Sequence, residues 1–154
     1  MKKKILETNE LIDRIKKKYK KIKIIQCHGV FDVLHIGHIN YLQESKLMGD
    51  LLIVTITSDK HVNKGANRPY FNQSLRAKSL AALQCVDYVC INDHPSSVEI
   101  IKKIKPKYYV KGRDYRKIKN NLDKNLILEK EAIEFVGGKL IFASGKIFSS
   151  SYII

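Results

Sequence analysis

The stretch GVFDVLHIGH, residues 29–38, places two histidines, an aspartate and two glycines within ten positions. His35 and His38 stand three residues apart, with Gly37 between them. Histidines in such a pattern can ligate a metal ion, exchange protons, or donate hydrogen bonds to a phosphate group. The surrounding sequence has to decide which of these three kinds of site is present.

The context of the stretch favours a phosphate site. An apolar run precedes it and a helical pattern begins at its end. A strand–turn–helix arrangement directs backbone N–H groups and the positive end of the helix dipole at one point. Gly29 and Gly37 would let a ligand approach the backbone. Asp32 and His28 lie nearby, but a zinc site usually needs a third protein ligand, and one histidine could simply satisfy buried backbone groups. We therefore interpret the stretch as a phosphate-binding motif without a protein-held metal.

The elements that would position this motif alternate between strand and helix. Runs of apolar and β-branched residues predict strands over 21–27, 51–57, 86–91, 108–112 and 139–143. Helical spacing and capping residues predict helices over 8–19, 38–49, 72–83, 96–104 and 122–136, the first of them capped by Thr8 or Asn9. This alternation predicts an α/β fold, a Rossmann-like, doubly wound, five-stranded parallel sheet with helices on both faces. Ligands of such sheets bind beyond the carboxyl ends of the strands, where the polar motifs fall.

The composition indicates one globular domain over residues 1–154. Hydrophobic residues make up 44% of the chain and charged residues 29%, and no apolar run has the length needed to cross a bilayer. The three cysteines stand in apolar surroundings without metal-binding spacing, which predicts reduced thiols and a cytoplasmic location. The final residues, FSSSYII, are typical of the first turn of another helix, so we expect that the chain could be one domain cut from a longer polypeptide.

The formal net charge of +14 indicates an anionic partner, such as nucleic acid, a membrane surface or phosphorylated small molecules. The lysines are scattered along the sequence, in the segments 2–4, 16–23, 102–107 and 117–130. A solvated lysine-rich surface without any partner explains the charge equally well. The charge alone therefore does not identify a partner.

Four segments carry a resemblance to a known family. Residues 29–38 resemble the G-x-F-D-x-x-H-x-G-H signature of the cytidylyltransferase-like nucleotidyltransferases. The segment KGANRP (64–69), with Asn72 and Arg76 after it, is similar to the K-G-x-x-R-P…N…R segment of heptose-1-phosphate adenylyltransferases. PKYYVKGRDY (106–115) resembles a strand end of the same enzymes, and FSSSYII resembles the closing I-S-T-S/T-x-I motif. The resemblance runs from about Lys21 to the last residue.

The resemblance implies transfer of a nucleoside monophosphate from a nucleoside triphosphate to a phosphorylated acceptor, with release of pyrophosphate. Because the attacking phosphate is already an anion, such a reaction needs no general base. The sequence agrees, since it offers no obvious carboxylate pair and no serine–histidine or cysteine–histidine system. The reaction needs positive charge and hydrogen-bond donors around the α-phosphorus. It also implies Mg²⁺ as the cofactor, bridging the triphosphate with few protein ligands.

The resemblance also assigns roles to particular residues. The expected catalytic residues are His35, His38, Lys64, Arg68 and Arg76. The expected nucleotide-binding residues are Gly29, Val30, Phe31, Asp32, Gly37, Lys111, Gly112, Asp114, Ser149, Ser150 and Ser151. Lys111 and Asp114 could equally line the acceptor pocket. Phe31 is also expected in the core, Asp32 could orient a loop or hold the metal indirectly, and His28 could tune the acceptor pocket.

The substrates stay open at this point. We expect a cytidylyltransferase acting on a sugar phosphate or polyol phosphate, as in capsule or lipopolysaccharide precursor biosynthesis. The alternative is an ATP-dependent heptose-1-phosphate adenylyltransferase, which the middle motifs favour and which is compatible with a fused sugar-kinase domain. We expect a homodimer, and no nucleic-acid or membrane partner. More distant alternatives are an RNA-binding module, which the net charge would suit, and a non-catalytic nucleotide sensor.

Overall fold

The computed structural model describes residues 3–112 and 124–145. The strands are β1 (Ile24–Gly29), β2 (Leu51–Thr57), β3 (Tyr88–Asn92), β4 (Tyr108–Lys111) and β5 (Lys139–Phe142). The helices are α1 (Thr8–Lys18), α2 (Ile36–Lys46), α3 (Gln73–Ala81), α4 (Val98–Ile104) and α5 (Lys124–Phe135), with a short 3₁₀ turn, η1, at Asp59–His61. Among the described residues, no helix is long and apolar enough to cross a membrane.

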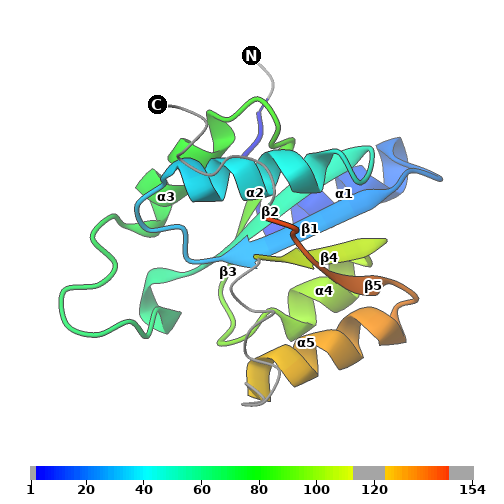
Figure 1. Ribbon diagram of the computed structural model, residues 1–154. Coiled ribbons are helices and arrows are strands. Elements are labelled where there is room, and N and C mark those ends of the chain that lie inside the picture. Colours follow the sequence, from blue (N-terminus) through cyan, green and yellow to red (C-terminus); the bar gives the residue numbers. More distant parts are fainter. Residues whose placement is uncertain (1–2, 113–123, 146–154) are drawn as a thin grey trace.

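The strands form one parallel sheet in the order β3-β2-β1-β4-β5 (Figure 1). The central strand β1 pairs with β2 on one side and β4 on the other, so that Cys27 lies opposite both Val54 and Val110. The chain thus runs outward from β1 in two directions, and the strand order reverses at β1. This arrangement confirms the predicted doubly wound α/β fold and places the ligand side at the carboxyl end of β1.

Helices cover both faces of the sheet. Leu42 of α2 and Leu80 of α3 pack with Ile25 and Val54 on one face. Leu11 of α1 and Ile100 of α4 pack with other strand residues on the opposite face, where α5 adds a smaller cluster beside β4. Residues of β1 and β2 alternate between these two layers, which explains why β2 is apolar at all positions except Thr55 and Thr57. Strand β1 is apolar at its start but also carries the polar side chains of Gln26 and His28.

The element boundaries differ from expectation where they matter most. Strand β1 begins three residues later than predicted and continues through His28 and Gly29. Helix α2 begins at Ile36, so that His35 is its N-cap residue and His38 lies in its first turn. The predicted caps of α1 were wrong, because Glu7 holds the N-cap position and Thr8 lies inside the helix. The predicted cap of α3 is confirmed, since Asn72 Oδ1 accepts the N–H of Leu75 at 3.0 Å.

Gly49, in the turn between α2 and β2, provides a test of this packing. A Cβ atom there would lie 2.7 Å from Ile25 Cδ1 and 2.9 Å from the carbonyl oxygen of Lys23. We expect Gly49→Ala to lower the free energy of unfolding by about 1–3 kcal/mol, because the core must shift to admit the methyl group. Gly112→Ala is the matched control, since a Cβ atom there meets no atom of the described residues within 4 Å. Equal denaturation midpoints for the two variants would contradict the packing described here.

Candidate active site

The signature stretch lies where β1 ends and α2 begins, at the carboxyl edge of the sheet (Figure 1). The N-terminal end of α2 is open to solvent, since His35, Ile36 and Gly37 are all exposed. The loop that carries Lys64 and Arg68 follows β2 at the same edge. The structure therefore brings the predicted catalytic segments together beside an accessible helix N-terminus, which favours anions.

The two histidines cap α2 with their Nδ1 atoms. Nδ1 of His35 accepts the N–H of Gly37 at 3.1 Å, and Nδ1 of His38 accepts the N–H of His35 at 3.3 Å. The ring centroids are 3.9 Å apart. In a neutral imidazole whose Nδ1 accepts a hydrogen bond, the proton is on Nε2. Both histidines are thus held as Nε2–H donors.

The environment of His38 keeps its ring neutral. Burial, followed by the nearby His35 and Lys64, lowers the pKa of His38 to about 4. At neutral pH, His38 therefore donates one hydrogen bond without carrying a charge. Lys64 is exposed, and its positive charge is one of the causes of this lowered pKa.

The two glycines of the motif make room for aromatic rings rather than only for a ligand. A Cβ atom at Gly37 would lie 2.9 Å from Cε1 of His35, and one at Gly29 would lie 3.0 Å from Cε2 of Phe31. Phe31 is buried, as predicted, and its backbone adopts φ 51°, a left-handed conformation that is rare for a bulky residue. Its ring lies edge-on to His38, with centroids 5.5 Å apart. Phe31 thereby fixes the position of the His38 ring.

Asp32 anchors the loop that follows β2. Its buried carboxylate accepts hydrogen bonds from Arg68 Nε at 2.9 Å, from the N–H of Tyr70 at 2.9 Å and from the N–H of Phe71 at 3.0 Å. Burial alone would raise the pKa of Asp32, but the two backbone N–H groups and Arg68 outweigh it and lower the pKa. Of the two roles considered for Asp32, the geometry supports orientation of a loop.

Arg76 holds the same region together from inside. Its side chain has no solvent exposure, and it donates to the carbonyls of Phe71 at 3.0 Å and Val30 at 2.8 Å and to Asp59 at 2.7 Å. The guanidinium is directed into the protein and joins three segments of the chain. This geometry supports a positioning role for Arg76 rather than direct contact with a phosphate.

Arg68 and Lys64 differ from Arg76 in their access to solvent. The Arg68 side chain is 30% exposed, and its guanidinium lies over the ring of Tyr70 at 4.6 Å from the ring centroid. Its ion pair with Asp32 engages Nε, so the other guanidinium nitrogens lie beyond that contact. Lys64 is exposed. These two cations lie in the loop after β2, at the same edge of the sheet as the histidine pair.

Lys111 lies in a buried polar network at the end of β4. Its Nζ is 3.2 Å from Oε2 of Glu129, and Oε1 of Glu129 accepts a hydrogen bond from Ser97 Oγ at 2.8 Å. Ser97 is also hydrogen-bonded to the hydroxyl of Tyr109. Sequence reasoning missed Glu129 and Ser97. Helical periodicity could have placed Glu129 inside, because it lies on the same face of α5 as Ala132 and Ile133.

His28 adds a second neutral imidazole near Lys111. Its Nδ1 lies 2.8 Å from Oγ1 of Thr55, and its Nε2 lies 3.4 Å from Oγ1 of Thr57. Burial, followed by the charge of Lys111, lowers the pKa of His28 to about 3. The two threonines were also missed, although they occupy alternate positions of β2 and Thr55 is the register partner of His28. Together these side chains form a polar floor beneath the carboxyl edge.

Some expected features lie elsewhere. Asp114, Ser149, Ser150 and Ser151 fall outside the described residues, and Gly112 borders them. Within the described ranges, no group of three or more histidine, cysteine, aspartate or glutamate side chains could hold a metal ion.

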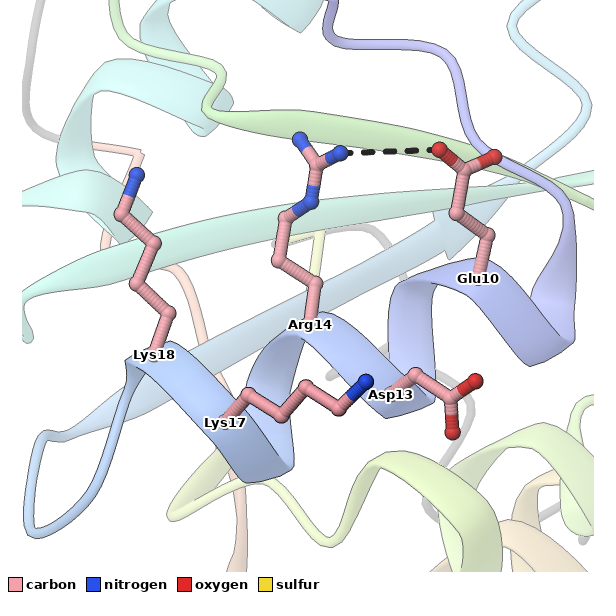
Figure 2. Close-up of a pocket in the computed structure, with 5 residues that line it drawn as sticks. All are labelled: Glu10, Asp13, Arg14, Lys17 and Lys18. Atoms are coloured by element: carbon pink, nitrogen blue, oxygen red, sulfur yellow. Dashed lines mark hydrogen bonds and ion pairs between the residues drawn. The ribbon is translucent and has the colours of Figure 1, made fainter.

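The hollow drawn in Figure 2 follows α1 and is lined by Glu10, Asp13, Arg14, Lys17 and Lys18. None of these is an expected site residue, and the C-terminal end of α1 leads into the opposite, amino edge of the sheet.

With this fold and this site, the chain is a nucleotidyltransferase domain. The cytidylyltransferase-like family model matches residues 26–154, and the chain belongs to that family. The resemblance drawn from the motifs is thereby confirmed.

The chain is also similar in sequence to part of the bifunctional HldE proteins. The chain is 43% identical over 138 residues to the bifunctional protein HldE of Campylobacter fetus, an alignment covering 88% of this chain and 29% of that protein. It is 42% identical over 147 residues to HldE of Campylobacter jejuni, covering 94% of this chain and 31% of that protein. The chain thus spans about a third of the length of the relatives it matches.

Solved structures show the same fold. A lipopolysaccharide core biosynthesis protein from Thermoplasma volcanium superimposes with a TM-score of 0.65 at 26% identity, covering 80% of this chain and 97% of that chain. Pantoate-β-alanine ligase from Francisella tularensis gives the same TM-score at 17% identity, covering 92% of this chain and 67% of that chain. The second likeness concerns the fold alone.

The buried His28 predicts a specific pH dependence of stability. A histidine whose folded pKa of about 3 lies below its ordinary value of 6.5 binds fewer protons when folded. The free energy of unfolding therefore falls as the pH drops below 6.5. Between pH 6.5 and 5 the loss from His28 should approach about 2 kcal/mol. We expect His28→Asn to lose correspondingly less stability than the original chain over this range, measured by urea unfolding. Parallel pH profiles would contradict the buried, neutral assignment.

The anchor at Asp32 predicts a combined loss of stability and activity. We expect Asp32→Asn to lower the free energy of unfolding by about 1–3 kcal/mol, because buried donors lose a charged acceptor. Loosening the Arg68 loop should also lower kcat/KM for the nucleotide about 10- to 100-fold, measured by pyrophosphate release. Asp93→Asn is the control, since Asp93 is an exposed carboxylate in the loop after β3. An equal effect in both variants would show that Asp32 has no special role.

Proposed function

We propose that this chain transfers AMP from ATP to the phosphate group of a heptose 1-phosphate, forming an ADP-heptose and pyrophosphate. The K-G-x-x-R-P segment resembles heptose-1-phosphate adenylyltransferases, and the matched relatives are bifunctional HldE proteins, with an adenylyltransferase related to this domain. The Thermoplasma protein of the same fold is described as a lipopolysaccharide core biosynthesis protein. These relatives support the adenylyltransferase alternative better than the cytidylyltransferase that we first expected.

The observation that carries the proposal is the pair of Nε2–H donors at the open N-terminus of α2. Backbone caps hold both rings in one tautomer, and Phe31 fixes the ring of His38. Donors that are already oriented need no rearrangement when negative charge grows on a phosphorus centre. The neutral ring of His38 also avoids the desolvation that a buried ammonium group would require.

The proposed reaction needs little covalent chemistry from the protein. An oxygen of the acceptor phosphate attacks the α-phosphorus of ATP, the new phosphoanhydride bond forms, and the bond between the α-phosphorus and the bridging oxygen breaks. The electron pair leaves with pyrophosphate. In this scheme His38 and His35 donate to the phosphate oxygens, while Lys64 and Arg68 offset the charge of the triphosphate.

Mg²⁺ enters this scheme as a companion of the triphosphate. The described residues offer no cluster of ligands for it, and the carboxylate of Asp32 is already bonded to three donors. We therefore assign no protein ligand to the metal and derive no step through it. Asp32 and Arg76 act in this scheme as positioning residues, which hold the loop that carries Arg68.

The acceptor has a candidate place beside the polar floor. His28, Thr57 and Lys111 line the carboxyl edge on the face covered by α4 and α5. A polyhydroxylated sugar could exchange hydrogen bonds with the imidazole and hydroxyl groups, while its phosphate would be attracted to Lys111. The proposal places the sugar here and the nucleotide above α2. Asp114 and Ser149–Ser151 remain predicted nucleotide contacts, by resemblance.

Pyrophosphate release tests the proposal directly. We expect release only when ATP, Mg²⁺ and a heptose 1-phosphate are all present, with kcat/KM at least 100-fold higher than for CTP or for glycerol 3-phosphate as acceptor. His38→Asn should lower kcat/KM about 100-fold or more, because one oriented donor is lost at the transition state. Its melting temperature should change by only a few degrees.

Two results would contradict the proposal. Faster turnover with CTP and a polyol phosphate would restore the cytidylyltransferase interpretation. Near-normal turnover of His38→Asn would remove the histidine pair from the mechanism while leaving the fold assignment intact.

A further inference from the structure

Lysines gather at the amino edge of the sheet, opposite the candidate active site. All five strands are parallel, so the segments that lead into them meet at one edge. The ends of α1 and α4 reach this edge too, because each is followed directly by a strand (Figure 1). The exposed lysines of these segments, here named the amino-edge lysines, are Lys16, Lys17, Lys18, Lys20, Lys21, Lys23, Lys102, Lys103, Lys105, Lys107 and Lys139. Lysines that are far apart in the sequence thus lie at one edge of the folded domain.

The charge of this edge is not neutralised within the described part of the chain. Of the carboxylates near it, Asp87 forms an ion pair with Lys46 at 2.7 Å, and Asp50 accepts the backbone N–H of Lys23 at 2.8 Å. Asp13 lies beside Lys17 on α1 (Figure 2). Within the described ranges, no amino-edge lysine has a carboxylate oxygen within 4.0 Å of its ammonium group. The edge therefore carries positive charge that would attract an anionic partner.

Two apolar side chains project from the same edge. Leu47 follows α2 and Phe135 ends α5, and each is 82% exposed, more than any other large hydrophobic residue described. Both precede the turn into a strand, which places them at the amino ends of β2 and β5. Lys102 Nζ lies 5.8 Å from the centroid of the Phe135 ring, so cationic and apolar groups are interleaved here.

The composition of the edge indicates which anion it suits. Lysines supply the exposed cations of this edge, whereas Arg14 of α1 is paired with Glu10 at 3.5 Å and lies over the ring of Tyr88. Arginine is favoured where phosphate or carboxylate is recognised with directional, paired hydrogen bonds, as in nucleic-acid and peptide sites. Attraction to a charged bilayer needs only point charges, together with apolar side chains that can enter the headgroup region.

We propose that the amino edge docks this domain reversibly onto a bilayer rich in anionic lipids, with Leu47 and Phe135 inserted among the headgroups. This replaces the expectation of no membrane partner, which rested on the lack of a spanning segment. The proposal does not depend on the identity of the substrates. Strand β2 separates the two edges by about 20 Å, and the two edges lie at opposite ends of the sheet, so the carboxyl edge faces away from the bilayer when the domain is docked.

Vesicle sedimentation with the full chain tests the proposal. We expect binding to vesicles of phosphatidylcholine with 40% phosphatidylglycerol at 50 mM salt, weaker binding at 500 mM salt, and no binding to phosphatidylcholine alone. The triple variant Lys17→Glu, Lys20→Glu, Lys107→Glu should bind at least tenfold more weakly. Its matched control is Lys60→Glu, Lys124→Glu, Lys130→Glu, which changes the net charge equally at exposed lysines away from the amino edge and should retain binding.

A second variant separates insertion from charge. Leu47→Ser with Phe135→Ser should reduce binding several-fold at 150 mM salt while leaving the melting temperature almost unchanged, since both side chains are exposed. Lack of binding to the anionic vesicles at 50 mM salt would overturn the proposal. Equal loss in the two triple variants would show a response to net charge alone and would overturn it too. Binding of bulk RNA at 150 mM salt, without binding to vesicles, would assign the edge to nucleic acid instead.

Discussion

The candidate site depends on one carboxylate. Asp32 lies inside the signature stretch, yet its three hydrogen bonds go to the loop after β2, which the chain reaches only after completing α2 and a second strand. Without this contact, no described hydrogen bond would tie Arg68 to the histidine pair. The buried Arg76 also links these segments, because it donates hydrogen bonds to the carbonyl of Val30 and to the carboxylate of Asp59. The predicted phosphate-binding groups are therefore held by a framework whose key side chains, Asp32 and Arg76, face inward.

Much of the fold could be predicted because it follows from periodicity. Strand 51–57 is apolar at nearly every position, and its predicted bounds match β2. Asn72, a typical N-cap residue, correctly predicted the start of α3. The errors fell where a local rule was overridden. His28 and Gly29 do not read as strand residues, yet pairing with β2 extends β1 through both. His35 is an unusual N-cap residue. Its Nδ1 accepts the N–H of Gly37, and this contact explains why α2 begins two residues before the predicted start at residue 38.

The sequence supplied candidate site residues but not the contacts between them. Motif spacing selected the histidines, Lys64 and Arg68 as candidates, but residue types cannot reveal which way a guanidinium turns. Arg76 and Arg68 look alike in the sequence, and only packing shows that one is enclosed and the other is partly exposed. Glu129 is separated from Lys111 by the segment before α5 and carries no motif, so its pairing appears only in three dimensions. The gathering of lysines at one edge is likewise a property of parallel topology, not of local sequence.

The ion pair between Lys111 and Glu129 also bears on what Lys111 can bind. Any anion attracted to Lys111 would have to compete with a carboxylate that already neutralises it, inside a region shielded from water. Part of that attraction would be offset by the cost of separating the pair, so Glu129 acts as an internal competitor for any anionic ligand of Lys111.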